Sequence, residues 1–214
     1  SMSTEELLAN IDFFTEQMRG PRTTPCTVLV LSGVGVASRP DTLPVIEAAR
    51  KQGIEHVVLH VGGEDLPELK VQRFHGVVDN LVIPVQPEAA ELAQVSRIIR
   101  DANEVGLSVA ANTVLTSNAL PGLKRSARTL SRVKPHSVTY TYPFPINGNE
   151  STNAPTPPRA LSALQSALQV LDTAGIAVRV KGLPACHLGN QAHRLGRTTN
   201  RYYVDSDHQK DEAL

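Results

Sequence analysis

Short apolar runs that alternate with amphipathic stretches are the feature of this sequence that most limits its fold. The apolar runs, rich in β-branched residues, predict strands at 26–31, 55–61, 77–85, 107–115, 137–142 and 176–180. Helical patterns, several of them ended by a glycine, lie between the strands at 41–52, 87–105, 120–133 and 157–174. Strands that alternate with helices form a parallel sheet, because each parallel connection needs a crossover. The sequence therefore predicts an α/β protein, a parallel (βα)6 partial TIM-like barrel.

Two segments of different character flank the predicted barrel, which spans residues 24–189. Residues 1–20 form an extra N-terminal helix, with acidic residues in its first turn and apolar residues at helical spacing. Its apolar face must pack on the end of the barrel or on a partner, and both interpretations stay open. Residues 190–214 lose all periodicity, so a polar, irregular C-terminal tail is expected.

Charge and composition limit the classes of partner. The chain carries 21 basic and 21 acidic residues, so its net charge is zero, and only 4% of its residues are aromatic. A nucleic-acid partner is not expected, because neither a basic surface nor a base-stacking platform is indicated. A membrane partner is not expected either, since no apolar run approaches 18 residues. Without a signal-peptide pattern, we expect a cytoplasmic protein.

Metal sites are not predicted. Cys26 and Cys186 cannot supply the three or four thiolates of a structural zinc or iron–sulfur site, and free buried thiols or a disulfide are the alternatives. His56 and His60 share one face of a strand, where packing is the favoured role. The adjacent Cys186 and His187 point to opposite faces of a strand, so they are not expected to activate each other.

The sequence Gly62-Gly63-Glu64 directly follows the second predicted strand. Two glycines allow a sharp turn and a close approach of the backbone to a ligand, and the carboxylate accepts hydrogen bonds from an amine or hydroxyl. Ligands of α/β folds bind at the carboxyl ends of the strands. The segment is therefore a candidate binding loop, with a plain strand-ending turn as the alternative.

Three residues are candidates for catalysis, although no triad or other specific motif identifies them. Glu64 and Asp79 supply carboxylates, and Lys181 ends the sixth predicted strand, where its amine can form a Schiff base or anchor a carboxylate. We expect these side chains to converge with Tyr142 on one pocket of the barrel.

Several segments together resemble a known superfamily. DTLPVIEAARKQG, EHVVLHVGGEDL, AANTVLT, TYTYPFPINGN and VRVKGLPACHLG are similar to parts of the radical S-adenosylmethionine core, which is a partial (βα)6 barrel. This resemblance implies that Gly62, Gly63 and Glu64 receive the amino group of the cofactor. It also implies that Asn112 and Thr113 face the ribose, and that the backbone near Gly182 and Leu183 faces the adenine.

One departure from that superfamily decides the predicted activity. The superfamily holds its cluster with a C-x3-C-x2-C loop, whereas SGVGVASRP without cysteine occupies this position here. We therefore expect no iron–sulfur cluster, and S-adenosylmethionine or a related nucleoside is the candidate ligand.

The favoured interpretation is a cluster-less relative, a pseudoenzyme that acts as a binding or regulatory subunit. Its protein partner or second copy would dock on the N-terminal helix or the open side of the barrel. The alternative is a non-radical enzyme on a TIM-like barrel that uses Glu64, Asp79 or Lys181 for acid–base or Schiff-base chemistry. The sequence leaves open whether the chain is an enzyme.

Overall fold

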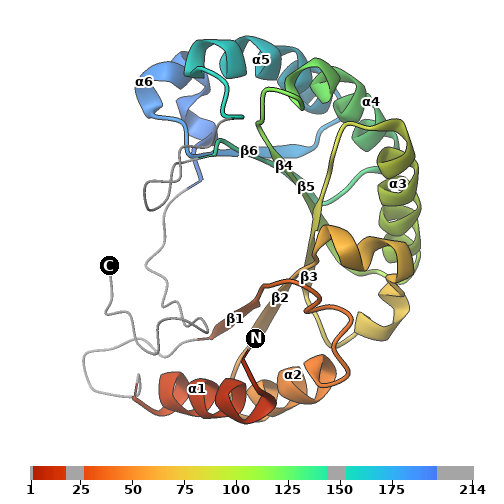
Figure 1. Ribbon diagram of the computed structural model, residues 1–214, viewed down its shortest axis with the longest axis vertical. Helices are drawn as coiled ribbons and strands as arrows, with labels where there is room; N and C mark the ends of the chain where they lie inside the picture. Colours follow the sequence, from red (N-terminus) through yellow and green to blue (C-terminus); the bar gives the residue numbers. More distant parts are fainter. Residues whose placement is uncertain (1, 18–26, 144–152, 197–214) are drawn as a thin grey trace.

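The computed structural model describes residues 2–17, 27–143 and 153–196, and its centre is one parallel sheet of six strands (Figure 1). The strands follow one another in chain order as β1 (Val28–Leu31), β2 (His56–His60), β3 (Asn80–Pro84), β4 (Ser108–Val114), β5 (Ser137–Thr141) and β6 (Ala177–Lys181). Every neighbouring pair is parallel. The predicted fold class, an α/β partial TIM-like barrel, is confirmed.

The helices lie on the outer side of the curved sheet (Figure 1). The α-helices are α1 (Thr4–Gln17), α2 (Thr42–Lys51), α3 (Ala89–Glu104), α4 (Leu123–Val133), α5 (Pro157–Thr173) and α6 (Ala185–Leu188). The 3-10 helices are η1 (Gly63–Glu68), η2 (Val71–Phe74), η3 (Leu120–Gly122) and η4 (Gly189–Arg194). None of the helices in the described ranges is long and apolar enough to cross a membrane.

The hydrophobic core fills the space between the sheet and the helices. Alternate residues of the central strands point into it, among them Leu59, Leu81 and Ile83, which are fully buried. Helix residues such as Ile98 and Leu164 meet them from the outer side. Burying one such side chain stabilises the fold by about 1.5–3 kcal/mol. Because only one face of the sheet is covered by helices, the inner, concave face is left to polar and smaller side chains.

Helix α1 packs on the barrel's own helix α2. The buried Ile11 contributes to the common core. Polar contacts fix the same interface: Thr4 donates to the Asp41 carboxylate, and Arg39 Nη1 donates to the Met2 carbonyl oxygen over 2.9 Å. Arg39 also pairs with Asp41 over 2.6 Å, and this hydrogen bond holds the pKa of Asp41 well below its usual range.

The C-terminal segment differs from the expected tail at its start. Residues 189–194 form η4, and Leu195 makes a parallel bridge with Val180 at the edge of β6. Gly196 then donates its N–H to the Val180 carbonyl oxygen over 3.0 Å. The chain therefore lies along the outer strand of the sheet up to the last residue described there.

Candidate functional site

The concave face of the sheet is defined here by the strand residues that point away from the helices. Strand register places the following side chains on this face: Val28, Val30, His56, Val58, His60, Asn80, Val82, Pro84, Ser108, Ala110, Asn112, Val114, Ser137, Thr139, Thr141, Ala177, Arg179 and Lys181. All except Ala110 are exposed or half-buried, whereas their neighbours along most strands are buried. This accessible face is where a ligand can meet strand side chains.

Polar side chains gather where β4, β5 and β6 end. Asn112, Thr139 and Arg179 lie side by side in register on these three strands. Thr141 and Lys181 are register partners two residues further towards the carboxyl ends of β5 and β6. We call these five residues the β4–β6 cluster. Active sites of TIM-like barrels lie at this edge of the sheet.

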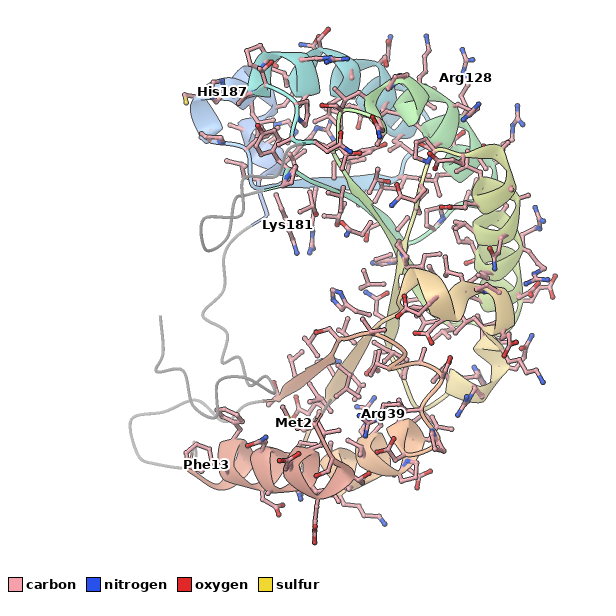
Figure 2. All side chains as sticks on the ribbon, in the orientation of Figure 1. Met2, Phe13, Arg39, Arg128, Lys181 and His187 are labelled. Atoms are coloured by element: carbon pink, nitrogen blue, oxygen red, sulfur yellow. The ribbon has the colours of Figure 1, made fainter. Side chains whose placement is uncertain are left out.

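Two contacts order the β4–β6 cluster. Thr141 Oγ1 donates to Asn112 Oδ1 over 2.9 Å, which orients the amide so that its NH2 group points elsewhere. The stem of Lys181 lies against Gly196, where an added Cβ would come within 3.3 Å of the lysine Cγ. Figure 2 labels Lys181 at the end of the curved sheet, on β6. The chain after η4 therefore helps to position the lysine.

The Gly62-Gly63-Glu64 segment forms the turn into η1, as the two glycines suggest. The next residue, Asp65, is 2% exposed and accepts hydrogen bonds from Gly62 N over 3.2 Å, from Ala37 N over 3.4 Å and from the Ser38 hydroxyl. Asp65 thus ties the loop after β2 to the loop after β1. Sequence analysis did not single it out.

Glu64 is exposed, and its Oε1 accepts the N–H of Gly35 over 2.7 Å. Its carboxylate folds back over Gly62, where a Cβ would meet only this flexible side-chain end, which can turn away. Glu64 follows β2, whereas Lys181 ends β6, and three strands lie between these two. The structure therefore places Glu64 in the loop after β2, at the same edge of the sheet, but not in the β4–β6 cluster.

The expectation that Asp79 converges with the other candidates is wrong. Asp79 immediately precedes β3, so it lies at the amino edge of the parallel sheet, opposite the edge that carries Lys181. It accepts hydrogen bonds from Val57 N and from Arg50 Nη2, each over 2.6 Å. Burial raises the pKa of Asp79, but these hydrogen bonds and the arginine charge outweigh it, and the net pKa is lowered. Asp79 is a structural carboxylate.

Thr113 and Tyr140 point away from the concave face. They are register partners on β4 and β5, and both are buried on the helix side, at 1% and 0% exposure. Neither hydroxyl has a hydrogen-bond partner among the described residues, and burial raises the pKa of Tyr140. Of the predicted ribose pair, only Asn112 therefore faces the concave side. The predicted adenine segment follows β6, with Gly182 half-buried and Leu183 buried in the core.

The remaining sequence candidates are dispersed. Tyr142 is not buried, and its hydroxyl donates to the Pro155 carbonyl oxygen over 2.6 Å. The expectation of a buried thiol is wrong for Cys186, which is exposed on α6, and Cys26 lies outside the described residues. Within the described ranges no group of three His, Cys, Asp or Glu side chains comes close enough to hold a metal ion.

Thr139, Thr141 and Arg179 of this site were not predicted from the sequence, and Arg179 is the clearest omission. Its signal was available, since it stands two positions before Lys181 in a strand and must therefore share its face. Sequence analysis likewise grouped Asn112 with Thr113, although adjacent strand residues point to opposite faces. Strand alternation would have selected Asn112, Arg179 and Lys181.

Comparisons with known proteins give a fold but no family. Neither a protein-family model nor a curated protein matches the sequence. Among solved structures, the HMG-CoA lyase from Brucella melitensis is similar with a TM-score of 0.56 and 12% identity, over 91% of this chain and 72% of that one.

The N-terminal domain of a "putative aldolase" from Bacteroides vulgatus is similar with a TM-score of 0.50 and 14% identity, over 85% of this chain. The alignment spans only 57% of that domain. At identities this low, the structural similarity shows only that the fold is shared, and this fold is TIM-barrel-like.

The resemblance to the radical S-adenosylmethionine superfamily is contradicted. The structural neighbours are an HMG-CoA lyase and an aldolase-like protein, not members of that superfamily. The cofactor roles inferred for Gly62, Gly63, Glu64, Asn112, Thr113, Gly182 and Leu183 rested on that resemblance and lose their basis. The interpretation as a cluster-less pseudoenzyme of that superfamily is withdrawn with it.

Proposed function

We propose that this chain is an enzyme that acts without radical chemistry on a small carbonyl compound, with Lys181 as the Schiff-base amine. The observation that carries the proposal is the position of Lys181 on the concave face, at the carboxyl end of β6, among the polar residues of the β4–β6 cluster. Active sites of TIM-like barrels lie at this end of the strands. The names of the two structural neighbours, an HMG-CoA lyase and a "putative aldolase", also fit an enzyme that acts on a carbonyl compound.

Schiff-base formation at Lys181 would involve two neighbouring residues of the β4–β6 cluster. The neutral amine of Lys181 attacks the carbonyl carbon to give a carbinolamine. Uptake of a proton and loss of water then leave an iminium ion, which withdraws electrons from the adjacent carbon. A second cation nearby is one of the arrangements by which proteins activate a lysine, and Arg179 occupies that position on the same face. Thr141, the register partner of Lys181, would order the cluster beside the lysine through its hydrogen bond to Asn112.

Glu64 remains the candidate for acid–base chemistry in this proposal. Its carboxylate lies in the loop after β2, at the edge of the sheet that also carries Lys181. Asp79 has no part in the proposal, because it lies at the opposite edge and is held by Arg50.

Reductive trapping tests the role of Lys181. The protein is incubated with pyruvate, acetoacetate or glyceraldehyde and then treated with borohydride, which converts an iminium into a stable secondary amine. We expect a single adduct per chain for a productive carbonyl compound, and peptide mass spectrometry should locate it on Lys181. The Lys181→Met variant should lose the adduct, while Lys124→Met, which removes an exposed lysine from α4, should retain it. Labelling spread over many lysines, or undiminished labelling of Lys181→Met, would reject the proposal.

A partner-binding role is the second candidate, and exposed apolar side chains favour it. Val30 on β1 and Val34 in the following loop are 38% and 89% exposed. Such side chains gain from burial against another protein. Light scattering of the purified chain tests self-association, which Val34→Ser should weaken if this surface joins two copies. An unchanged monomer signal in both proteins would exclude a second copy as the partner.

A further inference from the structure

The strand residues of the concave face carry positive charge without any negative charge. None of these residues in the six described strands is acidic, whereas Arg179 and Lys181 are basic. The whole chain, by contrast, has 21 basic and 21 acidic residues. The acidic residues that the structure describes lie on helices and loops instead, and a strand surface with only basic charge favours an anionic ligand.

Arg179 differs from the other arginines that the structure pairs with acids. Arg39, Arg50 and Arg194 bind Asp41, Asp79 and Asp172 within 2.6–2.7 Å. Across residues 2–17, 27–143 and 153–196, no carboxylate comes within salt-bridge distance of Arg179, and its guanidinium makes no hydrogen bond. It is also exposed. A guanidinium with five donors and no acceptor in the described part of the chain can bind a ligand oxyanion.

The side chains beside Arg179 on β5 and β4 can donate hydrogen bonds to the same ligand group. Thr139 is its register partner on β5, and Asn112 is the register partner of Thr139 on β4. Because Asn112 Oδ1 already accepts the Thr141 hydroxyl, the Asn112 NH2 group is the part of this amide that is left to donate. Neighbouring strands are about 4.8 Å apart, so the three side chains lie within reach of one small group.

From these observations we propose that Arg179, with Thr139 and Asn112, forms a subsite that binds the oxyanion group of the substrate, a carboxylate or a phosphate. This proposal rests on the proposed function for its link to Lys181, and it names the substrate class as an anionic carbonyl compound. Arg179 and Lys181 are two residues apart on one face, which separates their Cα atoms by about 6.6 Å. Both long side chains can therefore contact the same small molecule, one at its oxyanion and one at its carbonyl carbon.

Direct titration with two non-reacting anions tests the subsite. Malonate and inorganic phosphate are each added to the full chain at constant ionic strength, and binding is followed by two-dimensional NMR. We expect saturable binding of at least one of them, with shifts centred on β4–β6, and the tighter of the two identifies the oxyanion group. Lys181→Met should still bind the anion, since the proposed subsite does not need the amine.

Variants of Arg179 and a matched control decide the assignment. Arg179→Gln should weaken anion binding about fivefold, because it removes a charge-assisted contact of an exposed arginine. The affinity of Arg179→Lys for the anion should lie between those of the wild type and Arg179→Gln, since lysine keeps the charge but loses the planar guanidinium. The control Arg128→Gln makes the same change of charge on α4, where Figure 2 shows Arg128 on the outer side, and should change binding less than twofold.

The outcomes separate this proposal from the proposed function. Equal weakening by Arg179→Gln and Arg128→Gln, or binding unaffected by Arg179→Gln, overturns the subsite, as does the absence of saturable binding by the wild-type chain. If anion binding depends on Arg179 but borohydride never traps Lys181, the subsite stands and the Schiff-base function fails. If borohydride traps Lys181 but anion binding does not depend on Arg179, the Schiff-base function stands and the subsite fails. Circular dichroism of each variant confirms that it is folded.

Discussion

Replacing Asp65 with alanine should destabilise this protein more than any change of an exposed acidic residue nearby. The buried carboxylate accepts three hydrogen bonds, from two backbone N–H groups and one hydroxyl. Asp65→Ala leaves the N–H groups of Gly62 and Ala37 without an acceptor, and Ala37 is 2% exposed. Since an orphaned buried donor costs about 1–3 kcal/mol, and Ser38 is exposed and can turn to water, the free energy of unfolding should fall by about 2–4 kcal/mol.

Asp65→Asn provides a graded comparison. The asparagine can keep its oxygen towards the two backbone N–H groups and its NH2 group towards the Ser38 hydroxyl, which can then accept. The variant therefore loses the charge but not the geometry, and a loss of about 1 kcal/mol is expected. The expected order of stability is wild type, then Asp65→Asn, then Asp65→Ala.

Urea denaturation followed by circular dichroism measures these differences, because the chain has no tryptophan for fluorescence. Glu64→Gln is the matched control: Glu64 is exposed, and an amide oxygen can still accept the Gly35 N–H. It should change the unfolding free energy by less than about 0.5 kcal/mol. Our reasoning would be refuted if Asp65→Ala were as stable as the wild type, or if Glu64→Gln were equally harmful.

Three further changes test other parts of the structure. The lowered pKa of Asp79 stabilises the fold above the unfolded-state pKa of about 3.9, and this stabilisation is lost as the pH falls through the lower folded-state pKa. In urea titrations, the difference in unfolding free energy between the wild type and Asp79→Asn should therefore shrink as the pH falls below about 4. Tyr140→Phe removes a buried hydroxyl without a partner and should raise the thermal midpoint or leave it unchanged, whereas Tyr142→Phe loses a hydrogen bond and should lower it. Gly122→Ala places a Cβ against a proline ring and should cost about 1–3 kcal/mol in chemical denaturation, while Gly63→Ala, which meets no atom within 4 Å, should be tolerated.

The fold could be predicted from the sequence because short apolar runs recur six times and amphipathic helical patterns lie between most of them. The strands observed at 56–60 and 108–114 lie within one residue of those predicted at 55–61 and 107–115. The short helices were missed for a physical reason. Elements such as η2, with four residues, are too short to show a period, and tertiary contacts such as the burial of Phe74 decide their conformation.

The site could be predicted only in part, because periodicity gives the face of a residue but not its neighbours. The direction of the strands already excluded Asp79 from the carboxyl edge, and alternation already separated Thr113 from Asn112. What the sequence could not supply is the register between strands. Only the register brings Asn112 on β4 beside Arg179 on β6, although 67 positions of sequence, the difference between 112 and 179, separate them.

The open barrel explains why such a polar inner face is compatible with stability. In a closed eight-stranded barrel, inward side chains form packed apolar layers, and an unpaired arginine there would pay a large desolvation cost. Here the concave face is accessible, so Arg179 stays hydrated and costs the fold little. The same hydration limits its affinity, because a ligand oxyanion must replace water. An exposed ion pair contributes at most about 1 kcal/mol and each neutral hydrogen bond about 1 kcal/mol, so a lone anion should bind in the millimolar range. A substrate that is also held covalently by Lys181 would not need a tighter subsite, whereas submicromolar binding of malonate would mean that other parts of the chain enclose the anion.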